Sequence, residues 1–354
     1  FVGRRRVFRG NFQNAHSRIP SMTQQPTRRP TDEAHLTDGE FSPLPSLLNL
    51  PWIDCHNHAQ TLSWEDRERY SLTGCRGMVM VASGYHWTPY KPVEADDIRF
   101  LWDDVINRRR TIQRNHFFDA RIALGVHTGV PIANPDDLFA AMNEYCRAEP
   151  VVALGETGIT PTQHVQSWGL DEQRTVVGTQ MALADDHDLP IILHTPNQRP
   201  ADRPTYRPGV GTPGYEKNTD LTQAPVLTGE NPALEAVRMD VDIADEAGLS
   251  EDQIVASHAD PNNVDFLLSE TECYASFTLG YPWLTGVTAA DVADAIDRYG
   301  SDRILVETDC ANVLRTDVRS VKRAILELYR LGVDEDDIRQ VVLTNPSDVF
   351  GFDY

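Results

Sequence analysis

Positive charge is scarce in this sequence, and lysine is nearly absent: only Lys91, Lys217 and Lys322 occur, and 53 acidic residues face 32 basic ones. Asp also outnumbers Glu, by 34 to 19. Such a surface keeps a protein hydrated and soluble where concentrated salt screens its self-repulsion, so we expect a salt-rich cytoplasm. At molar salt the Debye length falls to about 3 Å, and the negative charge therefore does not exclude a nucleic-acid substrate.

Long apolar runs and paired cysteines are also missing. No stretch approaches the roughly 18 apolar residues that mark a membrane helix, and no apolar core suits a secretory signal. We therefore predict a cytoplasmic protein with no membrane partner. The five cysteines are an odd number without short paired spacing, which argues against both a disulfide framework and a thiolate zinc site.

The first 30 residues differ from the rest, because they hold seven Arg, no acidic residue and no apolar periodicity. This composition predicts disorder. The chain begins with Phe, and Met22 opens a stretch that soon turns acidic, so we favour translated upstream or added sequence over a basic arm for nucleic acid. We predict a disordered basic extension over residues 1–48 and one catalytic domain over residues 49–354.

Eight short apolar runs, most of them followed by a helical pattern, dominate the second part. The runs are Trp52 to His56, Gly77 to Ala82, Arg121 to His127, Val151 to Glu156, Pro190 to His194, Gln253 to His258, Cys273 to Thr278 and Arg303 to Asp309. Helical patterns cover Ala95 to Arg114, Asn134 to Arg147, Asp171 to His187, Pro232 to Ala247, Asn262 to Ser269, Ala289 to Tyr299 and Asp317 to Leu331. This alternation predicts an α/β fold of the TIM (β/α)₈ barrel type. An open doubly wound sheet fits less well, because no Gly-x-Gly-x-x-Gly turn follows the first strand.

Six potential metal ligands stand at the ends of the first, fourth, fifth, sixth and eighth runs: His56, His58, Glu156, His194, His258 and Asp309. The carboxyl ends of parallel barrel strands meet on one rim, where these barrels keep their chemistry. Alternate residues of a strand face the same side, so His56 and His58 can chelate one ion. Each histidine alone could be an ordinary core residue, but three separate strand ends favour a metal site.

Two carboxylates balance the charge of this predicted site. Glu156 follows small and apolar neighbours, and such a carboxylate can bridge two cations roughly 3.5 to 4 Å apart. Asp309 ends the eighth run, where it can ligate a metal and accept a proton from bound water. Glu307 faces the same side but deeper, which predicts a barrel-core acid or a partner of the ligands.

These motifs resemble the TatD family of metal-dependent hydrolases, within the amidohydrolase superfamily. The resemblance rests on Ile53-Asp54-x-His56-x-His58, Gly155-Glu156-Thr157-Gly158-Ile159, Leu189-Pro190-Ile191-Ile192-Leu193-His194 and Leu305-Val306-Glu307-Thr308-Asp309. It extends to Ala123-Leu124-Gly125-Val126-His127 and to the closing Thr344-Asn345-Pro346-Ser347. It covers nearly all of residues 49–352.

The resemblance implies a binuclear site. His56, His58, Glu156 and Asp309 would hold the first ion, and Glu156, His194 and His258 the second. Nitrogen and carboxylate ligands suit zinc and leave manganese, cobalt and magnesium open. A water between the ions would attack phosphorus or a carbonyl carbon while Asp309 takes its proton.

Three departures from the family pattern concern the substrate. TatD nucleases commonly carry an Arg shortly after the fifth-strand histidine, whereas here Thr195-Pro196-Asn197-Gln198 precedes Arg199. Ser257-His258-Ala259-Asp260 looks more like phosphotriesterase-type lactonases, and Ala59-Gln60 replaces the usual apolar and acidic pair.

The long segment 199–232 is either a binding loop or a solvated insertion. We predict His127, Arg199 and Tyr215 as substrate-binding residues.

We therefore predict a metal-dependent phosphoesterase with deoxyribonuclease-like chemistry, acting on a small molecule or a nucleic-acid end, with Asp309 and Glu156 catalytic. A lactone or amide hydrolase is the enzymatic alternative. A non-catalytic barrel that binds metal or a small ligand is the alternative of another class. The sequence leaves the oligomeric state open, a homo-oligomer included.

Overall fold

The computed structural model describes residues 45–83, 92–129, 132–160, 162–163, 168–195, 224–225, 227, 229–280, 286–311 and 317–354. Residues 1–30 lie outside these ranges, as do Arg199 and Tyr215. Among the described residues, no helix is long and apolar enough to span a membrane.

Within the described residues, eight parallel strands form one sheet in the order β1-β2-β3-β4-β6-β8-β9-β10. Their bounds are β1 Trp52–Asn57, β2 Cys75–Ala82, β3 Asp119–Leu124, β4 Val151–Thr157, β6 Ile191–His194, β8 Ile254–Ser257, β9 Tyr274–Thr278 and β10 Ile304–Glu307. The sheet closes just beyond β10, where Asp309 N donates to His56 O at 2.8 Å and His58 N donates to Cys310 O at 2.9 Å. The predicted TIM barrel is confirmed.

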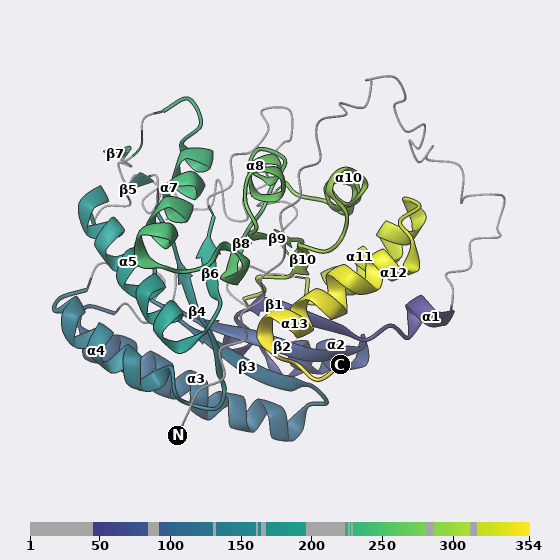
Figure 1. Cartoon of the computed structure of the whole chain (residues 1–354). Coiled ribbons are helices and arrows are strands. Elements are labelled where there is room, and N and C mark those ends of the chain that lie inside the picture. Colours follow the sequence, from purple (N-terminus) through teal and green to yellow (C-terminus); the bar gives the residue numbers. More distant parts are fainter. Residues whose placement is uncertain are drawn as a thin grey trace, which may run out of the picture.

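Helices surround this sheet (Figure 1). They are α1 Pro45–Leu48, α2 Trp64–Leu72, α3 Ala95–Asn115, α4 Pro135–Tyr145, α5 Leu170–His187, α7 Pro232–Ala247, α8 Val264–Ser269, α10 Ala289–Tyr299, α11 Ser320–Arg330, α12 Glu335–Arg339 and α13 Asn345–Phe350. Shorter elements are the 3₁₀ turns η1 Ala59–Thr61 and η2 Glu251–Gln253, the π-helical turn η4 Gln340–Thr344, and the antiparallel pair β5 Thr162–Gln163 and β7 Ala224–Pro225.

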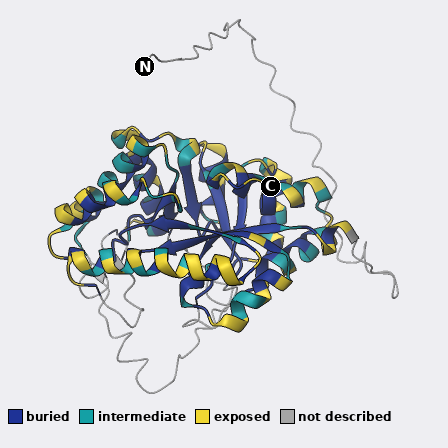
Figure 2. Cartoon of the chain, turned by 90° about the horizontal axis from the view of Figure 1, so that it is seen from below, coloured by how far each residue is buried: buried dark blue, intermediate teal, exposed yellow. Residues whose placement is uncertain are grey.

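Burial explains why these runs become barrel strands. All six residues of β1 and all four residues of β8 and β10 are buried, as befits parallel strands covered on both faces. Figure 2 shows the strands buried inside and the helices exposed along their outer faces. The polar residues inside the barrel therefore need partners of their own, and those at the carboxyl end of the strands form the candidate site.

The bounds of α7 and α10 agree with the predicted ones because both helices carry clear end signals. Asn231 caps α7 by accepting from Leu234 N at 3.1 Å, and Pro232 occupies the first turn. Gly248 ends α7 at a φ of 86°, a left-handed conformation that favours glycine. Thr288 and Asp291 form a capping box at the start of α10.

The structure corrects several predicted boundaries. Residues 45–48 are not a disordered extension: they form α1, Leu47 is buried in the core, and Lys322 Nζ donates to the carbonyls of Leu47 and Leu48 at 2.9 and 2.7 Å. The third strand ends at Leu124 rather than at His127. Helices α1, α2, α12 and α13 were not predicted.

Candidate metal centre

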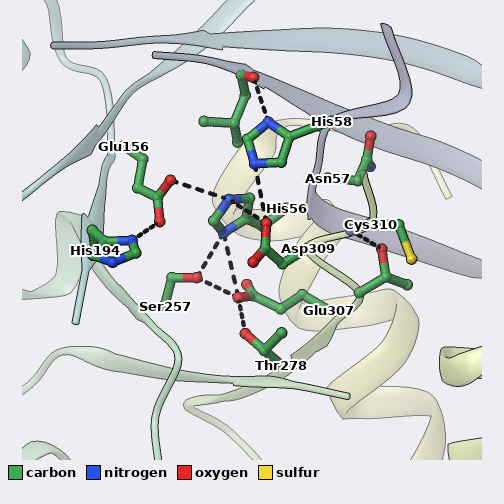
Figure 3. A network of polar contacts seen from close by, with 12 residues as sticks. His56, Asn57, His58, Glu156, His194, Ser257, Thr278, Glu307, Asp309 and Cys310 are labelled. Carbon is green, nitrogen blue, oxygen red and sulfur yellow. Dashed lines mark hydrogen bonds and ion pairs between the residues drawn. The ribbon is translucent and has the colours of Figure 1, made fainter. Parts of the chain in front are cut away.

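The structure brings all six predicted ligands together at the carboxyl ends of five strands. Figure 3 shows His56, His58, Glu156, His194 and Asp309. His56, Glu156 and His194 lie within β1, β4 and β6. The others follow their strands: His58 comes directly after β1, His258 directly after β8, and Asp309 two residues after β10. Parallel strands in one barrel therefore place residues from distant parts of the sequence on one rim, as predicted.

Their donor atoms form two overlapping groups within reach of a metal ion. In one group, Asp309 Oδ1 lies 3.0 Å from His58 Nε2 and 3.7 Å from His56 Nε2. The other group contains His56, Glu156 and His258, with ligand atoms within 4.8 Å of one another. Glu156 faces both sides, since its Oε2 lies 3.7 Å from His56 Nε2 and its Oε1 lies 3.1 Å from His258 Nε2. His194 contacts the same Oε1 through Nδ1.

The donor set fits a divalent cation. His56 Nε2 is buried and has no hydrogen-bond partner among the described residues, although such atoms are normally satisfied. His58 Nδ1 lies 3.0 Å from the Val81 carbonyl, which can only accept, so Nδ1 carries the proton. In a neutral imidazole, His58 Nε2 then presents a lone pair to Asp309 Oδ1, and a cation between these two acceptors would satisfy both.

The electrostatics of the site also favour positive charge. Burial acts to lower the pKa of His56, but the carboxylates of Glu156, Glu307 and Asp309 raise it to about 10. Burial likewise acts to raise the pKa of Glu156, but His194 and His56 hold it well below its ordinary value. Without a metal ion, these carboxylates favour protonated histidines. A bound metal ion would supply the positive charge in place of those protons.

Glu307 lies deeper in the barrel, as the strand alternation predicted, and contacts side chains on β1, β8 and β9. It accepts hydrogen bonds from the hydroxyls of Ser257, Ser276 and Thr278. Burial acts to raise its pKa, but His56, His258 and the hydrogen bond from Ser257 lower it to about 2. Glu307 is therefore a buried carboxylate beneath the ligands.

Asp54 and Thr308 hold the closing seam of the barrel beside the site. Asp54 Oδ1 accepts from Thr308 N at 3.0 Å, and its Oδ2 accepts from Thr308 Oγ1 at 2.6 Å and from the Tyr70 hydroxyl at 2.8 Å. These hydrogen bonds fix Thr308, the residue before Asp309. The backbone of Asp309 has a left-handed φ of 46°. His258 also has a positive φ, of 63°. Such backbone conformations in non-glycine residues cluster at functional sites.

Side chains on the outer helices form hydrogen bonds with residues next to the site. Gln180 on α5 accepts from Val126 N at 2.8 Å and donates to Thr157 Oγ1 at 2.8 Å, next to Glu156. Asp240 on α7 accepts from Ile159 N at 2.9 Å. Sequence reasoning assigned no role to Asp240, Asp54 or the Ser257 and Thr278 hydroxyls; their only signal was a polar residue inside an apolar run.

Of the predicted substrate-binding residues, only His127 lies within the described part of the chain. Its ring centroid is 4.7 Å from that of His194, and its Nδ1 accepts from Gly129 N at 2.9 Å. His127 thus lines the site beside the most exposed of the six ligands. His116 and His187 lie away from this centre and contact Glu68 and Asn143.

Known proteins resemble this chain in sequence and fold. A family model described as TatD related DNase matches residues 53–207. A protein of Methanocaldococcus jannaschii described as a metal-dependent hydrolase is 26% identical over 294 residues, which cover 83% of this chain and 97% of that protein.

Among solved structures, a TatD-like protein of Archaeoglobus fulgidus matches with a TM-score of 0.58 and 18% identity, over 85% of this chain and all of that one. A β-aspartyl dipeptidase of Fervidobacterium islandicum matches with a TM-score of 0.55 and 13% identity, over 85% and 73% of the two chains. These two likenesses concern the fold. In sequence, the chain is therefore similar to TatD related DNases over residues 53–207 and to a metal-dependent hydrolase over most of its length.

Proposed function

We propose that this protein is a hydrolase that uses two divalent metal ions, zinc in the first place, to cleave phosphoesters, nucleic-acid ends among them. The observation that carries the proposal is the pair of overlapping donor groups that share the buried His56, with His194 in contact with Glu156 of one group. The match to the family model of TatD related DNases supports the phosphoester class.

Glu156 is the residue that would join the two ions. His56, His58, Glu156 and Asp309 would hold one ion, and Glu156, His194 and His258 would hold the other. The two Glu156 oxygens face His56 and His258 respectively, which supports this bridging role. When bound, such ions lower the pKa of water toward neutrality and stabilise the negative charge that develops on oxygen.

Asp309 is the best placed of the site's carboxylates to move a proton. Its side chain is 18% exposed, whereas those of Glu156 and Glu307 are 2% and 0% exposed. A general base must reach the proton it accepts. We therefore assign to Asp309 the role of accepting the proton of the attacking water. The buried Glu156 would supply negative charge to the two cations.

The open side of the site indicates where the substrate enters. The His194 side chain is 34% exposed, the most of the six ligands. His127 stands beside it and can contact an oxygen of the scissile group. In this proposal Arg199 and Tyr215, which follow His194 in the sequence, add a positive charge and an aromatic ring for a phosphorylated substrate.

The test is hydrolysis of a single-stranded oligonucleotide and a small chromogenic phosphodiester in molar salt with added Zn²⁺ or Mn²⁺. His194→Ala should abolish cleavage, as should a chelator, while His187→Ala on the outer end of α5 should not. If the protein binds metal but cleaves neither substrate, the phosphoester class is wrong, and lactones and amides become the substrates to assay. If it also fails on those, the non-catalytic alternative gains support.

We also propose that the excess of 53 acidic over 32 basic residues adapts the protein to concentrated salt. The basic residues pair widely with exposed acids, as in Arg108–Asp104 at 2.6 Å and Arg298–Asp265 at 2.7 Å. The unbalanced acids that remain repel one another unless salt screens them.

A further inference from the structure

Two of the ligand histidines, from different strands, point their second ring nitrogen at a hydroxyl group. His56 Nδ1 lies 2.6 Å from Ser257 Oγ, and His258 Nδ1 lies 2.7 Å from Thr278 Oγ1. Both hydroxyls also contact one and the same atom, Oε1 of Glu307, Thr278 at 2.7 Å. Figure 3 shows Ser257, Thr278 and Glu307 together beneath His56. One carboxylate oxygen thus stands behind both imidazoles.

The number of hydrogens fixes the direction of these bonds. A hydroxyl has a single hydrogen, and a carboxylate oxygen can only accept. Ser257 and Thr278 must therefore each give their hydrogen to Glu307 Oε1, and each must accept from the histidine on its other side. Even a protonated Oε1 could donate to only one of the two hydroxyls. At least one of the two histidines is then held as the Nδ1–H form, and both are when Glu307 is ionised.

The same geometry turns the other ring nitrogen into a ligand. With the proton on Nδ1, the lone pair is on Nε2, and His56 Nε2 and His258 Nε2 are the atoms that face Glu156, at 3.7 and 3.1 Å. A metal-binding imidazole needs this arrangement, because the hydrogen bond of one nitrogen decides which nitrogen is free to bind.

We propose that Glu307 is a positioning residue that fixes the tautomer of both His56 and His258 through the Ser257 and Thr278 hydroxyls. Its consequence for metal affinity rests on the metal site proposed above, whereas its consequence for the tautomers does not. Glu307 on β10 thereby orients His56 on β1 and His258 after β8 so that Nε2 of each can bind a metal ion.

Ser276 offers a matched control within the same network. Its hydroxyl donates to Glu307 Oε2, the other oxygen of the carboxylate, and it also lies 3.7 Å from Cys55 Sγ. It is as buried as Thr278. Ser276 thus shares the burial and the carboxylate of Ser257 and Thr278. Within the described part of the chain, however, its hydroxyl contacts Glu307 and Cys55 rather than a ligand histidine.

The first measurement is the tautomer of each histidine in the metal-free, full-length protein, from ¹⁵N–¹H correlation spectra of ¹⁵N-histidine-labelled samples. His56 and His258 should each carry a proton on Nδ1. In Thr278→Val, His258 should lose its fixed proton on Nδ1 while His56 keeps its own, and Ser257→Ala should have the opposite effect. Thr278→Ser should keep the wild-type pattern. In Glu307→Met, neither histidine should hold a fixed proton on Nδ1. A bare Nδ1 on His56 and His258 in the wild type, with the proton on Nε2 alone, would overturn the proposal without the use of any variant.

The second measurement is metal affinity, by competition of Zn²⁺ with a chromophoric chelator. Thr278→Val and Ser257→Ala should weaken binding by about 10- to 100-fold, the usual cost of losing a partner of a ligand histidine. Thr278→Ser and Ser276→Ala should stay within about threefold of the wild type, well inside that range. Equal losses for Thr278→Val and Ser276→Ala would mean that the network only packs the core. A protein that holds its tautomers and binds zinc but hydrolyses nothing would refute the proposed function and leave this inference standing.

Discussion

Replacing Asp240 by Asn should stabilise the protein in alkaline solution by an amount that grows with pH. Asp240 lies on α7, is fully buried, and accepts from Ile159 N at 2.9 Å through Oδ1. Its Oδ2 has no hydrogen-bond partner within the described ranges. Burial raises the pKa of Asp240 to about 8, and the hydrogen bond from Ile159 offsets only part of this effect.

The direction follows from proton counting. The folded protein keeps the Asp240 proton up to a pH of about 8, whereas the unfolded chain releases it near an ordinary aspartate pKa of about 3.9. Between these values the folded state binds one proton more, so this group costs stability as the pH rises. The slope is about 1.4 kcal/mol per pH unit, and the whole window amounts to on the order of 5 kcal/mol. Asn has no such proton and still accepts from Ile159.

The assay is urea unfolding of the wild type and Asp240→Asn at several pH values from 5 to 9, at constant molar KCl and with a chelator present. The gain in stability of the variant should increase up to about pH 8 and then level off. Asp242→Asn, at an exposed position of the same helix, should leave the pH dependence unchanged. A difference between wild type and Asp240→Asn that stays constant from pH 5 to 8 would refute the reasoning.

Four further predictions concern the site and the surface. Glu156→Gln should remove metal-dependent hydrolysis and lower the bound metal per chain in elemental analysis, because the shared ligand loses its charge; full metal content with normal turnover would contradict its bridging role. Zn²⁺ at 100 times its dissociation constant should stabilise the wild type by about 2.7 kcal/mol in thermal unfolding, with little gain in His194→Ala, since only the folded state offers the complete site. Gly280→Ala should destabilise the chain by more than about 3 kcal/mol, because the added Cβ would lie 1.6 Å from the Thr308 carbonyl oxygen; unchanged urea unfolding would show that this close approach is not required. Lowering KCl from 1 M to 0.1 M lengthens the Debye length from about 3 to about 10 Å and should lower the melting temperature. A higher melting temperature at 0.1 M KCl would contradict the proposed adaptation of the acidic surface to salt.

The sequence was sufficient to predict the barrel because its strands are short apolar runs with helical patterns between them. It also predicted the cluster of six candidate ligands, since a His, Glu or Asp at the end of such a run stands out from its neighbours. The boundaries near the rim were less predictable. Gly125 ends the third strand early, where a Cβ would lie 2.4 Å from the backbone of Gly155, and no local pattern records this contact.

The supporting residues could not be predicted for a different reason. Ser257 and Thr278 look like ordinary strand residues, and their role depends on Glu307, which is 50 and 29 positions away in the sequence. Asp54 and Thr308 meet across 254 positions. Helix α2 was missed, although Ser63 caps it and Tyr70 reaches Asp54, because its polar first turn shows little apolar periodicity. Such partners become visible only when the barrel closes.

That closure has a consequence for the order of events during synthesis. His56 and His58 emerge from the ribosome early, while β10 and Asp309, which follows it, emerge near the end. The seam between β1 and β10 can form only afterwards, when Asp309 N meets His56 O and Thr308 meets Asp54. A nascent or truncated chain therefore holds the two early histidines without their carboxylate partner. The complete donor set exists only in a chain translated through β10, so an unfinished product should neither retain metal tightly nor act on substrate.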